Sequence, residues 1–281
     1  MLTRIITGAV GIVLAAFVIQ TGGWLFAGFA LLLSLIAWFE FARAFVHKHE
    51  NILFFIGVVA LFFIWGCSYL GNNDELIGVI TISMLVMLAA AVFLHGRVSF
   101  TGAALSVAGI LYFGLPFGHM VLLRMMQPDT MLSTPLGSFS FGCAMIWVMF
   151  IGTWSSDSFA YFTGRAFGSH KLCRTISPNK TVEGFLGGVV GTIVMTALVG
   201  WFFSLPVLEL AVLGFFISIF GTVGDLVESV AKRYTGIKDS GNIIPGHGGV
   251  WDRFDSVLFT APLVYYFALV SDLAMKVGGA A

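Results

Sequence analysis

The sequence predicts an all-α, polytopic integral membrane protein with about nine transmembrane helices. Of its 281 residues, 58% are hydrophobic and only 10% are charged, whereas about a quarter of a typical soluble domain is charged. Mean hydropathy is +0.98. Apolar runs of roughly 20 residues, long enough to cross a bilayer as a helix, recur along the whole chain. The expected environment is therefore a lipid bilayer, and no soluble domain is expected.

Breaks in hydropathy divide the chain into its expected elements. In order, these spans cover residues 5–20, 24–46, 52–71, 76–95, 102–124, 140–163, 182–204, 206–230 and 254–274. The first span follows Met1 and Arg4 without a convincing small-residue cleavage site, so it is expected to remain uncleaved. The nine spans are expected to form a single membrane domain over residues 1–281, with five spans at about 5–124 and four at about 140–274.

The distribution of lysine and arginine predicts the orientation of these spans. With the N-terminus inside, only Arg124 and Lys276 of the fourteen basic residues fall outside, and twelve fall inside. Positive charge concentrates on the cytoplasmic side of membrane proteins. Because a missed or invented span would scatter the downstream charges over both faces, this agreement supports nine spans with the N-terminus and the charged loops in the cytoplasm.

Overall charge and cysteine usage exclude some classes of function. The formal net charge is zero, so no global positive field indicates a nucleic-acid partner. Cys67, Cys143 and Cys173 lie far apart without metal-ligand spacing, and we interpret them as free thiols. Phosphate chemistry in this protein would have to use local charge.

Charge is concentrated in two segments, 154–185 and 221–256. In the second, Asp225, Glu228 and Lys232 follow the spacing i, i+3, i+7 and share one face of the eighth span. An ionised aspartate at membrane depth needs a cavity, a cation or a metal, which makes Asp225 a functional candidate. The alternative is a structural ion pair between Asp225 and Lys232.

The loop after the eighth span has the composition of an oxyanion site. Glycines let backbone N–H groups approach a phosphate, basic side chains supply charge, and carboxylates hold a hard cation such as Mg²⁺. The loop and the residues beside it provide Arg233, Lys238, Asp239, Pro245, Gly246, His247, Gly248, Gly249, Asp252, Arg253 and Asp255. His247 is expected to contact phosphate or substrate, and its alternative is an ordinary solvated histidine.

The first charged segment adds a second set of candidates. Asp157, Tyr161 and Gly164 share a helical face at the inner end of the sixth span, although the serines around Asp157 also suit a solvated interface. Ser177 and Pro178 are expected to be N-cap and N1 of the seventh span, whose N-terminus would attract anions. Lys180 beside it is expected to hold a triphosphate or lipid phosphate, or else only to follow the positive-inside rule.

These motifs resemble a known family. Segment 229–255, SVAKRYTGIKDSGNIIPGHGGVWDRFD, resembles the signature of the phosphatidate cytidylyltransferases (CDP-diglyceride synthetases) in its polar residues and their spacing. Ala231 departs from the pattern, where the family has a larger apolar residue, and this concerns packing. DSFAYFTGRAFG and SPNKTVEG in the first segment are also similar to the family, whereas the first five spans match only in hydropathy.

The resemblance implies that CTP and phosphatidic acid react to give CDP-diacylglycerol and pyrophosphate in phospholipid biosynthesis. It also implies Mg²⁺ as cofactor, with a second cation possible, and a homodimer. Short loops suit a bacterial inner (plasma) membrane. The four C-terminal spans would be the catalytic half.

The resemblance further implies roles for individual residues. The implied metal ligands are Asp225 and Asp252. The other catalytic residues would be Lys232, Lys238, Asp239 and His247. The substrate-binding residues would be Asp157, Lys180, Ser229, Arg233, Arg253 and Asp255. Asp157, Asp239 and Asp255 are also secondary candidates for metal ligands.

Two other classes of membrane protein compete with this interpretation. An ion-coupled transporter also uses intramembrane carboxylates, but its site would lie near the bilayer midplane, and the charges here gather at one face. A CDP-alcohol phosphotransferase would need an aspartate-rich pattern that this sequence lacks. Outside the charged segments, Glu40 and Arg43 form an expected structural i, i+3 pair.

The predicted orientation can be tested directly. A tag inserted between Arg233 and Arg253 should be accessible to impermeant reagents only from the cytoplasmic side, because this loop follows the inner end of the eighth span. Labelling of intact and inverted vesicles would measure it. Accessibility from the outside would contradict both the orientation and the use of this loop for a cytoplasmic nucleotide.

Overall fold

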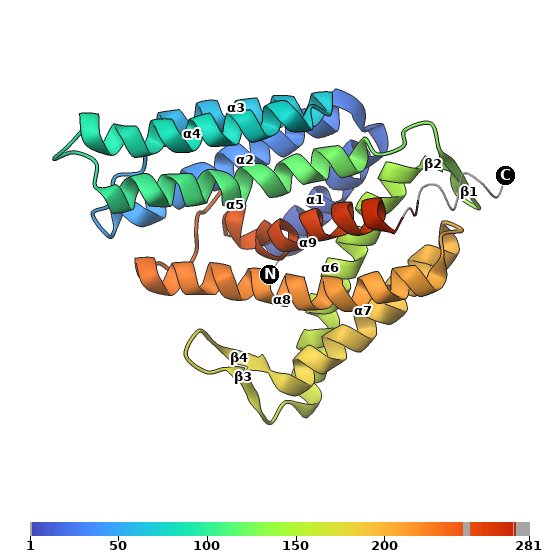
Figure 1. The fold of residues 1–281 in the computed structure, drawn as a ribbon. Helices are drawn as coiled ribbons and strands as arrows, with labels where there is room; N and C mark the ends of the chain where they lie inside the picture. The colour runs from blue at the N-terminus through green and yellow to red at the C-terminus, as the bar shows by residue number, and fades with distance from the viewer. Residues whose placement is uncertain (1, 244–247, 272, 274–281) are drawn as a thin grey trace. The chain divides into compact units, whose positions relative to one another are not determined.

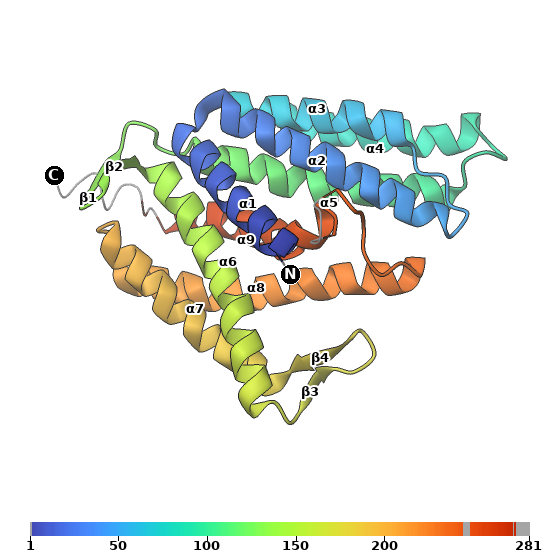
Figure 2. The same cartoon turned by 180° about the vertical axis from the view of Figure 1, so that it is seen from behind.

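The computed structural model describes residues 2–243, 248–271 and 273, which form nine helices and four short strands (Figures 1 and 2). The helices are α1 (Leu2–Thr21), α2 (Gly23–Val46), α3 (Phe54–Leu70), α4 (Asn73–Phe93), α5 (Phe100–Arg124), α6 (Phe141–Phe167), α7 (Val182–Phe202), α8 (Val207–Thr235) and α9 (Trp251–Val270). The strands are β1 (Met131–Thr134), β2 (Gly137–Ser140), β3 (Lys171–Cys173) and β4 (Ser177–Thr181). The predicted all-α class is confirmed.

Helix length and composition agree with a polytopic membrane protein. Among the described residues, six helices are long and apolar enough to cross a membrane: α2, α4, α5, α7, α8 and α9. Helix α3 and the Thr7–Thr21 part of α1 are apolar but shorter, so membrane crossing by α1, α3 and α6 stays a prediction. Helices α6 and α8 run past their predicted ends, and basic residues in their last turns suit a helix C-terminus.

The chain folds as two compact units. Unit 1 comprises Met1–Leu122 and Ala231–Phe254, and unit 2 comprises Leu123–Val230 and Asp255–Ala281. Helices α8 and α9 therefore contribute residues to both units. The prediction of a single membrane domain is not decided by this division.

An aromatic cluster forms the core of unit 1. Trp38 and Phe41 on α2 pack with Phe113 on α5 and with Trp251 at the start of α9, and ring centroids lie 5.5–5.8 Å apart. Trp38, Phe113 and Trp251 are fully buried. Because Trp251 begins α9, burial of its ring fixes the start of this helix against α2 and α5.

In unit 2, small residues let α6 and α7 approach closely. Gly184 and Gly188, four positions apart on α7, face the backbone of α6 at Ala160 and Ser156. Such small-xxx-small spacing is typical of membrane helices that pack through close backbone contact. The hydroxyls of Ser156 on α6 and Ser218 on α8 form a buried hydrogen bond of 2.9 Å. Packing and hydrogen bonding thus hold α6 beside both α7 and α8.

The predicted N-cap and N1 residues of the seventh span are wrong, whereas its predicted range, 182–204, begins at the residue where α7 begins. Ser177 and Pro178 belong to β4, which pairs antiparallel with β3, and α7 begins at Val182. Thr181 is the N-cap, and its hydroxyl accepts a hydrogen bond of 3.1 Å from the Gly184 N–H. A two-stranded hairpin has only edge strands, which tolerate proline. Lys180 therefore lies on a strand, directly before the helix.

Adding a methyl group at Gly191 should weaken the contact between α6 and α7. A Cβ at this position would lie 2.7 Å from the Phe159 Cβ, closer than packed carbons allow. We expect Gly191→Ala to lower the free energy of unfolding by about 1–3 kcal/mol, measured by reversible unfolding in mixed micelles. Gly78→Ala on α4 is the control, because a Cβ there meets nothing within 4 Å. Equal effects in both variants would contradict close packing at Gly191.

Candidate functional site

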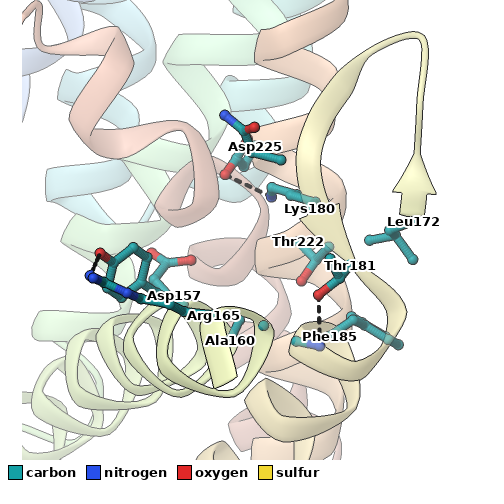
Figure 3. Close-up of a pocket in the computed structure, with 13 residues that line it drawn as sticks. Asp157, Ala160, Arg165, Leu172, Lys180, Thr181, Phe185, Thr222 and Asp225 are labelled. Carbon is teal, nitrogen blue, oxygen red and sulfur yellow. Dashed lines mark hydrogen bonds and ion pairs between the residues drawn. The ribbon is translucent and has the colours of Figure 1, made fainter. Parts of the chain in front are cut away.

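Unit 2 contains a pocket of about 490 Å³ between α6, the β3–β4 hairpin, α7 and α8, with charged side chains in its lining. Helix α6 contributes Asp157 and Arg165, the hairpin contributes Lys180, and α8 contributes Thr222 and Asp225. Figure 3 shows Lys180 reaching toward Asp225, while Asp157 and Arg165 line the pocket from α6. The pocket thus combines two carboxylates with two cationic side chains.

Lys180 and Asp225 form an ion pair in this pocket. The Lys180 Nζ lies 2.7 Å from the Asp225 Oδ2, with 26% and 30% of the two side chains exposed. The predicted alternative, an ion pair between Asp225 and Lys232, is not the pairing that the structure describes. Because both side chains are partly exposed, an anion that enters the pocket can compete with Asp225 for the ammonium.

The predicted face of α6 is confirmed, since Asp157, Tyr161 and Gly164 all line the pocket. Arg165, one turn beyond Tyr161, donates a hydrogen bond of 3.1 Å to its hydroxyl. Asp255 on α9 interacts electrostatically with Asp157, Asp225 and Lys180. Asp255 is thus close enough to the pocket carboxylates Asp157 and Asp225 to interact with them electrostatically.

A second polar arrangement lies in unit 1, around Asp252 on the first turn of α9. The Asp252 Oδ1 accepts from the Lys232 Nζ at 2.9 Å. Its Oδ2 accepts from the Ser240 N–H, the Ser240 hydroxyl and the Gly249 N–H, each at 2.9 Å. Only 7% of the Asp252 side chain is exposed. Asp252 therefore ties α8 to both described ends of the predicted oxyanion loop.

The loop backbone is shaped to reach this carboxylate. Gly248 has φ of +87°, a conformation that favours glycine, and a Cβ there would lie 2.7 Å from the Asp252 Oδ2. The Ser240 hydroxyl also contacts Glu40 on α2, with an Oγ to Oε2 distance of 3.1 Å. The predicted pair between Glu40 and Arg43 is wrong, because no ion pair of the described residues joins them. Glu40 instead accepts hydrogen bonds from the loop.

The remaining predicted residues divide between the two units. In unit 2, the Ser229 hydroxyl lies 3.4 Å from the Asp225 Oδ1, within a weak hydrogen bond. In unit 1 the following predicted residues are exposed: Arg233, Lys238, Asp239 and Arg253. Asp239 lines a small pocket of about 190 Å³ together with Arg43 and His47. His247, with Pro245 and Gly246, lies outside the described residues.

The donor chemistry at Asp225 and Asp252 suits a hard cation, since both offer carboxylate oxygens. Each carboxylate already neutralises a lysine ammonium. No three His, Cys, Asp or Glu side chains in the described part of the chain are arranged as ligands of one metal ion. Asp225 and Asp252 belong to different units, so their service as two ligands of one cation stays a prediction.

Several pocket residues were missed as candidates from the sequence. Arg165 is one of the twelve basic residues predicted to lie inside, and it follows Asp157 by eight positions, a spacing that keeps both within one broad stripe of a helix. Thr222 lies one turn before Asp225 on α8, at i−3, and the same spacing rule could have found it. Ser240 and Glu40 carry no local signal, because their contact joins positions 200 residues apart.

Taken together, the two arrangements can bind anions and stabilise negative charge. Each places a lysine ammonium on a carboxylate, and Arg165, Arg233, Lys238 and Arg253 add further cationic groups in the same units. Phosphate groups are the natural ligands of such side chains. The structure therefore favours chemistry in which phosphates are held and their charge is neutralised.

Comparison with known proteins agrees with this chemistry. The model of the cytidylyltransferase family matches residues 2–271. A Bacillus subtilis protein named phosphatidate cytidylyltransferase is 33% identical over 272 residues, which cover 94% of this chain and 96% of that protein. A Staphylococcus haemolyticus protein of the same name is 35% identical over 269 residues, covering 94% and 97%.

The contacts of Asp252 predict an unequal effect of its two partners. Asp252→Asn removes the charge that holds Lys232 and weakens three further bonds, whereas Lys232→Met leaves those three bonds in place. We expect Asp252→Asn to cost more stability, by about 1 kcal/mol or more. Thermal unfolding of both purified variants in detergent measures the order. A larger loss for Lys232→Met would contradict the organising role of Asp252.

Proposed function

This chain belongs to the cytidylyltransferase family and is a nucleotidyltransferase, and from that premise we propose that it transfers the cytidylyl group of CTP to phosphatidic acid. The products would be CDP-diacylglycerol and pyrophosphate, and the reaction would serve phospholipid biosynthesis. One observation carries the proposal: the family match spans residues 2–271 and so includes both lysine–aspartate pairs.

In this reaction a phosphate oxygen of phosphatidic acid forms a bond to the α-phosphorus of CTP. The bond between the α-phosphorus and the oxygen bridging to the β-phosphate breaks, and pyrophosphate leaves with that electron pair. A phosphate nucleophile is already ionised at neutral pH, so no general base is required. What the protein must supply is alignment of two anions and neutralisation of their charge.

The basic side chains of the two arrangements suit this task. We propose that Lys180 and Lys232 bind phosphate groups by exchanging their aspartate partners for substrate oxygens. Arg233, Lys238 and Arg253 are exposed and would bind the outer phosphates of CTP. Ser229 and His247 would lie near the reacting groups, as the family resemblance implies.

We further propose that Asp225 and Asp252 bind Mg²⁺. The proposal includes a second cation at the same site. Support comes from their oxygen donors and from the positive charge that each already binds. Asp157, Asp239 and Asp255 are secondary candidates. When bound, the ion would neutralise charge on the departing pyrophosphate.

Family membership and the apolar helices also bear on the cellular location of the protein. The apolar helices indicate a membrane protein, and its bacterial relatives imply a plasma membrane. We propose that the N-terminus and the charged loops face the cytoplasm, where CTP is available, while phosphatidic acid keeps its acyl chains in the bilayer. A homodimer is part of the proposal, and the mass of the purified protein in detergent would test it.

Conversion of radiolabelled CTP tests the proposal. Purified protein in micelles with phosphatidic acid and Mg²⁺ should form lipid-soluble cytidylate, and chelation of Mg²⁺ should abolish it. Asp225→Ala and Asp252→Ala should each remove turnover while leaving membrane insertion intact. No product from folded wild-type protein over a range of lipids and cations would contradict the proposed reaction, and normal turnover in either variant would contradict the metal assignment.

A further inference from the structure

Glu40 is a buried carboxylate of α2 that the proposed chemistry does not use. Only 2% of the residue is exposed. Its Oε1 accepts from the Val250 N–H at 3.0 Å, and its Oε2 accepts from the Trp251 N–H at 2.8 Å. The Ser240 hydroxyl lies 3.1 Å from the same Oε2. All of these contacts lie within unit 1 and reach the segment that resembles the family signature.

The charge of Glu40 is compensated by the loop itself. Within the described part of the chain, no ion pair involves Glu40. Its donors are instead backbone N–H groups at the N-terminal end of α9, where the helix dipole favours negative charge. Burial of a carboxylate is tolerated only with such donors. Displacement of the loop would therefore leave a buried charge without hydrogen bonds, so Glu40 opposes loop movement.

The loop approaches Glu40 too closely to carry side chains at two positions. A Cβ on Gly241 or on Gly249 would overlap the Glu40 carboxylate oxygens. The close approach of Glu40 is therefore one reason for glycine at both positions, in addition to any role of these glycines in phosphate binding. The fit between the α2 carboxylate and the loop is close on both described sides of the loop.

A short chain of contacts links Glu40 to the Lys232–Asp252 pair. The Ser240 hydroxyl contacts Glu40 at 3.1 Å and the Asp252 Oδ2 at 2.9 Å. Gly249, which packs on Glu40, donates its N–H to the same Asp252 oxygen. The Asp252 Oδ1 holds the Lys232 ammonium at 2.9 Å. Glu40 is thus connected through Ser240 and Gly249 to this aspartate and lysine.

We propose that Glu40 is a positioning residue that clamps residues 240–241 and 249–251 and thereby aligns Asp252 and Lys232 for the transfer reaction. The effect on turnover rests on the proposed function, whereas the clamping of the loop does not. Helix α2, which lies outside the predicted catalytic half but inside the family match, would then contribute directly to the geometry of the active site.

Glu40→Gln tests the clamp with two independent measurements. The amide keeps the size of the side chain but replaces one acceptor oxygen with an NH₂ group that faces a donor. Hydrogen–deuterium exchange of peptides covering residues 248–254 should become faster. Turnover per folded protein should fall by on the order of 10²-fold, the scale of a misplacement of about 1 Å, and much of the loss should be in kcat.

Two further variants make the outcome decisive. Glu50→Gln is the matched control, because Glu50 contacts the Ser99 hydroxyl rather than the loop, and it should change neither measurement. Glu40→Asp keeps the charge on a shorter side chain and should give an intermediate effect. It also serves as the test variant if Glu40→Gln does not fold.

The possible results separate the two proposals. Faster exchange with reduced turnover in the Glu40 variants, and neither in the control, supports the positioning role. Unchanged exchange, or normal turnover per folded protein, overturns it. If the wild-type protein itself does not convert CTP, the proposed function fails, and the exchange measurement still decides whether Glu40 clamps the loop.

Discussion

Carboxylates within an apolar chain need positive charge or N–H donors, and the polar architecture of this protein depends on meeting that need. The chain has fourteen acidic and fourteen basic residues, so few charges are available. Asp225 is neutralised by Lys180, Asp252 by Lys232, and Glu40 by backbone N–H groups. Each of these contacts joins elements that are distant in sequence. Charge compensation therefore also connects the β3–β4 hairpin to α8, and α9 to α2 and α8.

The packing of each unit supports these polar contacts. In unit 1, the aromatic cluster around Phe41 buries Trp251, which places the first turn of α9 where Glu40 can reach its N–H groups. In unit 2, glycines on α7 allow close approach to α6, and the pocket opens where these helices meet the β3–β4 hairpin. Apolar and steric packing thus places the helices that carry the charged side chains.

The chemistry proposed for this protein makes modest demands on its side chains. Nucleotidyl transfer to a phosphate requires positioning and charge neutralisation rather than a strong base. Lysines held by aspartates are suited to this, because a part-exposed ammonium can change partners when an anionic substrate arrives. Rigid support matters more than reactivity for such chemistry, which gives a structural role to residues such as Glu40 and Ser240 that hold Asp252 in place.

The sequence by itself determined the helical class, the approximate bounds of the nine helices in the described part of the chain, and the shared face of Asp157 and Tyr161. All of these depend on local properties, namely hydropathy summed over a window and side-chain spacing along one helix. Tertiary structure alone decided the partners: Lys180 rather than Lys232 for Asp225, a strand rather than a helix start at Ser177, and the loop rather than Arg43 for Glu40. The bond from Val250 to Glu40 joins residues 210 positions apart, and no spacing rule reaches so far, because such pairing depends on which elements pack together.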